Sequence, residues 1–171
     1  PDPKDLQQYL TAVRSLLVEL SDKIAIKSKL SDEHKPLYRQ IVFTAAWQES
    51  CWRQWIKKGT PVTSTTGDVG LMQVNRNTWR SLYDLKGLNG DIQYNGNAGG
   101  EILLYYLTKY AIRKNEDKQA GGNLARATYS AYNGGPGALG RYRGVRQAPV
   151  WKKVDEAFWE KFQMVSAGNE M

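Results

Sequence analysis

The sequence predicts a single, mainly α-helical domain with one short extended or β segment, and three observations lead to this prediction. The 171 residues match one ordinary domain and are enough to bury a sizeable core. Apolar residues recur at helical spacing along most of the chain. No repeat, charge block or low-complexity linker divides it. We therefore expect one domain over residues 1–171.

Helix signals open the chain. Asp2 can cap a helix whose first position is Pro3, and the stretch from Lys27 onward is polar. An N-terminal helix is therefore expected within residues 1–30. Its apolar positions are Leu6, Leu10, Val13, Leu17, Leu20 and Ile24.

A second helix is expected over Ile41–Trp55, after start signals at Ser31 and Pro36, and should stop by Gly59. Counting roughly 100 degrees per residue, Glu49 falls in the middle of its apolar face. The other members of this face are Tyr38, Val42, Ala45, Ala46, Trp52 and Ile56.

A carboxylate on an apolar face is out of place. An ionised carboxylate facing a dry core is costly, so the group raises its pKa and holds its proton. A protonated carboxyl is what a general acid requires. The alternative is that Glu49 pairs with Arg53, four residues later, on a solvated helix face.

The middle of the chain is rich in turn residues. Pro61, a Ser/Thr run and Gly67 predict turns, and the residues after them predict a short strand or extended turn. A brief helix and then a long glycine-rich loop should follow. The expected order is turns over 60–68, the extended segment over 69–74, a helix from Asn75 or Asn77 to Tyr83, and the loop over 87–100.

Three helices are predicted in the remaining residues. The first follows the loop and places Ile102, Leu103, Tyr106, Leu107 and Tyr110 on one side, where we expect the apolar centre of the fold. The second runs from Asn123 to Tyr132 and ends at Gly134 and Gly135. Pro149 begins the C-terminal helix, which is expected over residues 149–165.

Composition limits the possible functions. The 24 Lys and Arg residues outnumber the 17 Asp and Glu residues, and the net charge of +7 favours polyanions such as nucleic acid, acidic membrane and bacterial cell wall. The single cysteine, Cys51, excludes an internal disulfide, and with the single histidine, His34, it cannot make a zinc site of the usual ligand count.

The longest apolar run, Ile102–Leu107, is too short to span a bilayer, so no transmembrane segment is expected. The chain opens on Pro1 without a signal peptide, which suggests a processed form or a part of a longer protein.

Three segments together carry a family signal. They are Glu49-Ser50, then Ser64-Thr65-Thr66-Gly67-Asp68-Val69-Gly70-Leu71-Met72-Gln73, then Ala131-Tyr132-Asn133-Gly134-Gly135. In order and spacing they resemble the motifs of the soluble lytic transglycosylase domain, a relative of goose-type lysozyme. The helix opening at Asn95–Leu107 is also similar to that family, and the resemblance is strongest over residues 38–137.

The resemblance implies a lysozyme-like fold and cleavage of the β-1,4 bond between N-acetylmuramic acid and N-acetylglucosamine in peptidoglycan. It implies that Glu49 acts as general acid and then as general base, so that the C6 hydroxyl of the muramoyl sugar closes a 1,6-anhydro ring. No metal or organic cofactor is implied. Peptidoglycan glycan strands would be the partner, and a monomer in the bacterial cell envelope, periplasmic or extracellular, is expected.

The family pattern also implies roles for four further residues. Ser64 would orient the Glu49 carboxyl by a hydrogen bond, and Gln73 would lie in the sugar-binding cleft. Tyr132 would reach the carboxyl or the developing oxocarbenium charge, while Asn133 would contact an N-acetyl group. Aromatic faces for sugar rings could come from Trp47, Trp52, Trp55, Trp79 and Tyr94.

Two features depart from the family. Asp68 follows Glu49 by nineteen residues, and if it faces the cleft it could activate water, so that the enzyme hydrolyses as a lysozyme does; otherwise it is a turn acid. The family has an acidic and aromatic element near its C-terminus, and the residues of this sequence nearest to that pattern are Glu156 and Trp159.

Other motifs in the sequence point to rival functions. Gly135–Gly140 matches G-x-G-x-x-G but follows a helix, so dinucleotide binding is not expected. A thiol peptidase pair of Cys51 and His34 is disfavoured because Cys51 lies on the helix of Glu49. The basic stretch 141–146 with Lys152 and Lys153 could bind single-stranded nucleic acid, but a solvated basic face is the more usual explanation, and no nucleic acid is expected. The rival from a different class is a module that binds peptidoglycan without cleaving it.

Overall fold

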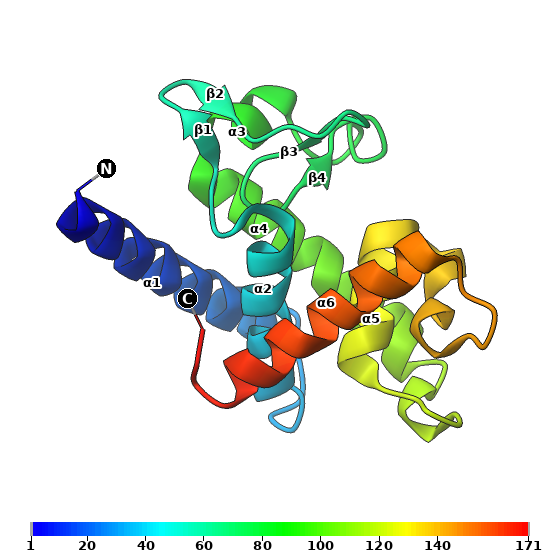
Figure 1. The fold of residues 1–171 in the computed structure, drawn as a ribbon. Helices are drawn as coiled ribbons and strands as arrows, with labels where there is room; N and C mark the ends of the chain where they lie inside the picture. The colour runs from blue at the N-terminus through cyan, green and yellow to red at the C-terminus, as the bar shows by residue number, and fades with distance from the viewer. Residues whose placement is uncertain (1, 171) are drawn as a thin grey trace.

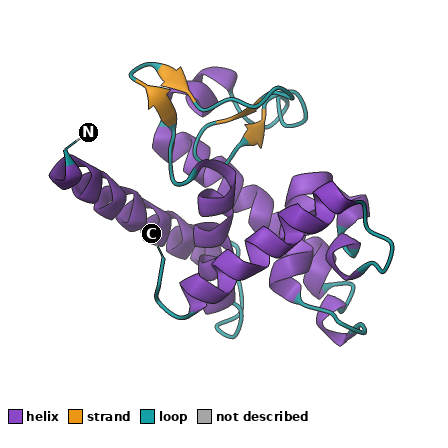
Figure 2. Cartoon of the chain, viewed as in Figure 1, coloured by secondary structure: helices purple, strands orange, loops and turns teal. Residues whose placement is uncertain are grey.

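The computed structural model describes residues 2–170, which form a mainly α-helical fold with two small β-hairpins (Figure 2). This confirms the predicted fold class, including the β segment beside the Gly-Leu-Met-Gln motif. The elements are α1 (Pro3–Lys27), α2 (Lys35–Ser50), β1 (Trp55–Lys57), β2 (Thr60–Pro61), β3 (Asp68–Val69), β4 (Val74–Asn75), α3 (Leu85–Gly90), α4 (Ile92–Tyr106), η1 (Leu107–Ile112), η2 (Glu116–Lys118), α5 (Leu124–Gly134), η3 (Pro136–Ala138), η4 (Arg141–Arg143) and α6 (Pro149–Ser166).

Helix α1 begins as the sequence predicts. The Asp2 side chain accepts a hydrogen bond from the Lys4 N–H at 3.0 Å, and Pro3 occupies the first turn. The apolar stripe becomes buried from Val13 onward, whereas Leu6 stays 49% exposed because the N-terminal end of α1 extends away from the other helices (Figure 1). The buried stripe therefore attaches α1 to the fold through its C-terminal half.

Helix α2 lies in the centre of the fold, between α1 and α6 (Figure 1). It ends at Ser50, so the prediction that it continues to Trp55 is wrong. Cys51 and Trp52 both adopt positive φ angles, of 53° and 59°. The indole of Trp52 is fully buried and donates to the Phe43 carbonyl at 3.1 Å. Packing of this large side chain against its own helix therefore ends α2 earlier than the apolar periodicity indicates.

The chain after α2 forms two antiparallel hairpins, β1–β2 and β3–β4. The second confirms the extended segment predicted over 69–74, with Gly70–Gln73 as its turn. The first replaces the end of the predicted helix, and Ile56, expected on the buried face, is instead 67% exposed on β1.

The glycine-rich stretch 87–100 is helical, so the prediction of a long loop is wrong. It contains the end of α3 and the start of α4. A Cβ at Gly99 would lie 2.5 Å from the Met72 Cγ, and one at Gly96 would lie 2.8 Å from a Leu20 methyl group. These glycines let α4 approach its neighbours closely, which the sequence pattern alone does not distinguish from loop chemistry.

The brief helix predicted from Asn75 or Asn77 to Tyr83 is also wrong. Asn75 Oδ1 does accept from the N–H groups of Asn77 and Thr78, as a helix cap would, but the chain continues as turns. The side chain therefore makes a capped turn that no helix extends.

The C-terminal helices follow the prediction. The Asn123 side chain caps α5 by accepting from the Arg126 N–H at 2.9 Å, and Gly135 ends it with φ 84°. Helix α6 begins with Pro149 and packs its buried Phe158 and Phe162 on the fold, although Val150 is 60% exposed. Buried apolar residues from α1 to α6 form one connected core. Within residues 2–170, none of the helices combines the length and apolarity that crossing a bilayer requires.

Candidate active site

Glu49 lies in the last turn of α2 and is partly buried. Its Oε1 accepts a hydrogen bond from the Tyr129 hydroxyl of α5 at 2.7 Å. Burial is the largest influence on the carboxyl group and raises its pKa to about 7; the Tyr129 hydrogen bond lowers the pKa, and the charge of Asp68 raises it further. Glu49 can therefore hold its proton near neutral pH and still release it readily.

The alternative pairing of Glu49 with Arg53 does not form. Because α2 ends at Ser50, Arg53 is no longer one helical turn away on the same face. Its Nε donates instead to the Ser50 carbonyl at 3.1 Å. The charge that acts on the pKa of Glu49 is instead that of Asp68, a like charge.

A cavity of about 440 Å³ lies beside this carboxyl group. Its walls come from the β3–β4 hairpin, helix α4, the C-terminal end of α5 and the first turn of α6. Glu49 is not itself part of the wall, but it is close enough to Asp68 and Tyr132, which are, for its charge to raise the pKa of Tyr132. The cavity is therefore a candidate space for a substrate of Glu49.

The Gly70–Gln73 turn is held by two buried amides from outside the hairpin. Gln54 Oε1 accepts from the Leu71 N–H at 2.9 Å, and Asn95 Oδ1 accepts from the Met72 N–H at 2.8 Å. Gly70 has φ +76°, and a Cβ there would lie 2.5 Å from Gln54 Oε1. Glycine is therefore required both by the backbone conformation and by the closeness of these amides.

Three of the predicted binding residues line the cavity, namely Gln73, Tyr132 and Asn133. The Gln73 amide donates to the carbonyls of Val62 and Gly70, which fixes its position. The Tyr132 hydroxyl donates to the Met72 carbonyl at 2.5 Å rather than to Glu49. Tyr132 thus connects α5 to the Gly70–Gln73 turn. Of its expected contact with the Glu49 carboxyl group, only an electrostatic effect is present, in which the charge of Glu49 raises the pKa of Tyr132.

Ser64 does not lie against Glu49 as expected. Its hydroxyl donates to Asp68 Oδ2 at 2.5 Å, so the predicted hydrogen bond to Glu49 is wrong. The partner of Glu49 is Tyr129, which sequence reasoning missed. Tyr129 precedes Tyr132 by three residues on the same helix and so shares its face, a spacing that could have indicated it.

Asp68 belongs to the hairpin and to the cavity wall at once. Its carboxylate accepts from Ser64, from Thr66 at 2.7 Å and from Asn75 at 2.9 Å. Partial burial acts to raise its pKa, but these hydrogen bonds outweigh burial and leave the pKa lowered. The two acids of the site therefore differ: the pKa of Glu49 is raised to about 7, whereas the pKa of Asp68 is lowered and its carboxylate is ionised near neutral pH.

Near the C-terminus, Asp155 and Trp151 are joined through Arg141, and Glu156 and Trp159 do not take part in this cluster. The buried Asp155 receives both Nε and Nη2 of Arg141, at 2.9 and 2.7 Å, and the guanidinium lies 4.9 Å from the Trp151 ring. Trp151 lines the cavity, whereas Glu156 pairs with the exposed Lys152 at 3.8 Å. Asp155 therefore fixes the wall of the cavity through Arg141.

The residues considered for rival functions make other contacts in the structure or lie apart from one another. Within the basic stretch 141–146, Arg141 pairs with Asp155 and Arg143 with the buried Glu116. His34 bonds to Ser31, and Cys51 is exposed beyond the end of α2. Among residues 2–170 no group of His, Cys, Asp and Glu side chains gathers that could hold a metal ion.

Comparison with protein families gives a match. The family model described as the Transglycosylase SLT domain matches residues 29–153, which include Glu49, Tyr129 and every residue that lines the cavity, but not Asp155. Searches of curated proteins and of solved structures found no match. Because the family model covers most of the chain, the protein belongs to the SLT transglycosylase domain family, whose activity is of the lytic transglycosylase type and is directed at peptidoglycan.

Proposed function

We propose that this protein is a lytic transglycosylase that cleaves the β-1,4 bond between N-acetylmuramic acid and N-acetylglucosamine and leaves a 1,6-anhydro end. The observation that carries the proposal is the Glu49 carboxyl, whose pKa of about 7 suits both donation and acceptance of a proton. Its hydrogen bond from Tyr129 and its interaction with Asp68, which lines the cavity of about 440 Å³, support the proposal further.

The reaction needs one carboxyl group and one proton. Protonated Glu49 donates its proton to the glycosidic oxygen, the bond to the anomeric carbon breaks, and N-acetylglucosamine leaves with a free hydroxyl. The Glu49 carboxylate then accepts the proton of the muramoyl C6 hydroxyl as its oxygen bonds to the anomeric carbon. Glu49 ends protonated, as it began, and no water is consumed. This chemistry requires no metal or organic cofactor.

The wall residues would hold the sugars. Gln73 and Asn133 offer amides for hydroxyl and N-acetyl groups, and Tyr132 lies where it could stabilise positive charge at the anomeric carbon. Trp79 and Trp151 offer aromatic faces in the same cavity. Ser64 would act indirectly in this proposal, since it holds Asp68 in the wall.

Hydrolysis by a muramidase mechanism is the second candidate, because the ionised Asp68 faces the same cavity. An ionised carboxylate could take a proton from an attacking water. Against this candidate, the Asp68 oxygens already accept hydrogen bonds from Ser64, Thr66 and Asn75, so little of the carboxylate is free to act.

Digestion of purified sacculi, followed by mass spectrometry of the products, tests the proposal. Anhydromuropeptides support the transglycosylase, reducing-end muropeptides indicate the muramidase, and no products would leave a binding module. Glu49→Gln should abolish product formation, and Glu156→Gln, an exposed glutamate of α6, is the matched control that should retain it. Full turnover by Glu49→Gln would refute the assignment.

The remaining expectations are proposals of the same kind. We propose that residues 1–171 act as one domain, as a monomer, and in the bacterial envelope, periplasmic or extracellular. The connected core from α1 to α6 supports a single domain, and peptidoglycan as substrate supports the location. Sedimentation of the purified protein tests the monomer.

A further inference from the structure

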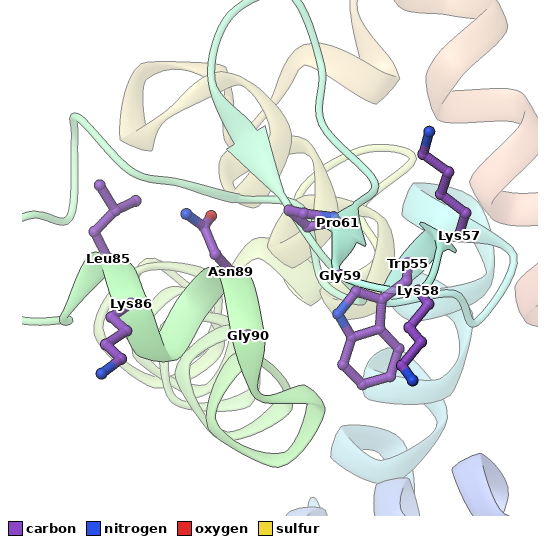
Figure 3. Close-up of a pocket in the computed structure, with 9 residues that line it drawn as sticks. All are labelled: Trp55, Lys57, Lys58, Gly59, Pro61, Leu85, Lys86, Asn89 and Gly90. Carbon is purple, nitrogen blue, oxygen red and sulfur yellow. The ribbon is translucent and has the colours of Figure 1, made fainter.

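A second cavity, of about 1010 Å³, lies between the β1–β2 hairpin and helix α3 (Figure 3). It shares no wall residue with the cavity beside Glu49. In Figure 1 the β1–β2 hairpin and the β3–β4 hairpin lie on different sides of their part of the fold, and only the latter faces α5 and α6. We refer to this second cavity as the hairpin groove.

The hairpin groove is positively charged. Lys57 and Lys58 border it from the hairpin, and Lys86 borders it from α3; all three are exposed. In the part of the chain that the structure describes, none of them is paired with an acid, and no Asp or Glu lines the groove. The Lys58 ammonium lies near the Trp55 ring, and the Lys57 and Lys86 side chains extend outward from the rim, so the lysines favour carboxylates that reach beyond the hollow (Figure 3).

The inner surface suits an amide-bearing sugar. Its walls are mostly apolar and include the partly buried Trp55 and Pro61. The side chain of Asn89 rises from α3 toward the strand that carries Pro61 (Figure 3). Its Oδ1 is buried, and within residues 2–170 it accepts no hydrogen bond. The Asn89 amide offers a polar group to an acetamido substituent, while the Trp55 indole offers a face to a sugar ring.

We propose that the hairpin groove is a second, non-catalytic binding site for peptidoglycan, which takes an N-acetylated sugar together with the carboxylates of its peptide stem. The proposal rests on the proposed function, since it names the same polymer as substrate. Binding here would keep the enzyme on the wall while the cavity beside Glu49 acts on a strand. Nucleic acid fits less well, because a polyphosphate backbone calls for a track of cations rather than lysines around one hollow.

Gln54 joins the groove to the Gly70–Gln73 turn. Gln54 Nε2 donates to the Leu88 carbonyl of α3 at 2.9 Å, and its Oε1 accepts from Leu71 in the turn. Substitutions that test the groove must therefore leave Gln54 unchanged. The three lysines and Trp55 meet this condition, since no hydrogen bond joins their side chains to Gln54 in the described residues.

The test measures binding to sacculi in a Glu49→Gln background, so that cleavage does not remove the ligand. The groove variant carries Lys57→Gln, Lys58→Gln and Lys86→Gln. The matched control carries the same loss of charge at three exposed lysines elsewhere: Lys4→Gln, Lys109→Gln and Lys118→Gln. Cosedimentation should show an affinity lower by about tenfold for the groove variant and close to the parent for the control.

A second variant tests the sugar contact. Trp55→Ala should also lower sacculus affinity, and its thermal unfolding should be measured beside it to verify that the fold persists. A soluble disaccharide tetrapeptide, titrated against the labelled parent protein, should shift the indole N–H signal of Trp55 and the side-chain amide signals of Asn89. Retention of these signals unchanged at saturation would overturn the proposal whatever the variants do.

Parental affinity in the groove variant, or an equal loss in the control, would also overturn the inference. So would an unchanged affinity for sacculi accompanied by lost affinity for DNA or for anionic lipid vesicles, because the groove would then serve another polyanion. Failure of the proposed function is a separate result, in which the wild-type protein releases no anhydromuropeptides from sacculi. That measurement uses no groove variant, so the two failures can be distinguished.

Discussion

Replacement of Tyr129 by phenylalanine tests the tuning of Glu49 directly. The hydroxyl donates to Glu49 Oε1 at 2.7 Å, and this hydrogen bond favours the ionised carboxylate. A hydrogen bond to a charged group contributes about 1.5–3 kcal/mol, and one pKa unit corresponds to about 1.4 kcal/mol. Because water from the cavity can partly replace the hydroxyl, we expect a rise of about one unit, from about 7 to about 8.

The assay is the pH dependence of kcat/KM for release of anhydromuropeptides. Activity requires protonated Glu49 in the free enzyme, so the rate should fall as pH rises through its pKa. In Tyr129→Phe this alkaline limb should move to higher pH by about one unit, and the maximal rate should drop because the acid is weaker. Carboxyl carbon NMR of labelled glutamate should report the same shift.

Tyr132→Phe is the matched control from the same helix. Its hydroxyl donates to the Met72 carbonyl, so its removal should weaken the contact between α5 and the turn without moving the limb. An unmoved or acid-shifted limb in Tyr129→Phe, or an equal shift in both variants, would refute the tuning of Glu49 by Tyr129.

Further predictions concern stability. The pKa of Glu49 in the folded protein lies above its unfolded value, so the stability that its protonated form contributes is present below about pH 4.5 and is lost as the pH rises through about 7. Glu49→Gln should therefore raise the free energy of unfolding by about 3 kcal/mol at alkaline pH and change it little at acid pH. Urea titrations at an acid and an alkaline pH can verify this difference. Gly70→Ala should lower the free energy of unfolding by about 3 kcal/mol, and Gly59→Ala by only about 1 kcal/mol. The two φ angles match, at +76° and +77°, but only at Gly70 would a new Cβ meet close neighbours. Equal losses in the two variants would contradict the close approach of Gln54. Asp155→Asn should cost about 3 kcal/mol, since it leaves a largely buried guanidinium without its counter-charge, whereas Glu156→Gln should stay within about 0.5 kcal/mol, and similar melting temperatures for the two variants would argue against the buried pair.

Local chemistry determined much of the fold in advance. Helix caps and first-turn prolines depend only on residues a few positions away, so the sequence predicts them correctly. The residues that begin or end helices as predicted are Asp2, Pro3, Asn123, Gly135 and Pro149. The same holds for the apolar stripes of α1 and α6, whose period needs no partner to be recognised. The mainly α fold and a catalytic candidate on α2 could therefore be predicted from sequence.

Tertiary structure decided the rest. The end of α2 at Ser50, the helical state of the glycine-rich stretch 87–100 and the bond from Tyr129 to Glu49, eighty residues apart, all depend on which distant side chains meet. In the sequence, the glycines of this stretch predict a loop. In the structure, Met72 fills the space beside Gly99, which shows that glycine there allows close helix packing. Periodicity and capping are short-range interactions that the chain carries with it, whereas close packing and buried hydrogen bonds exist only once the helices have been brought together.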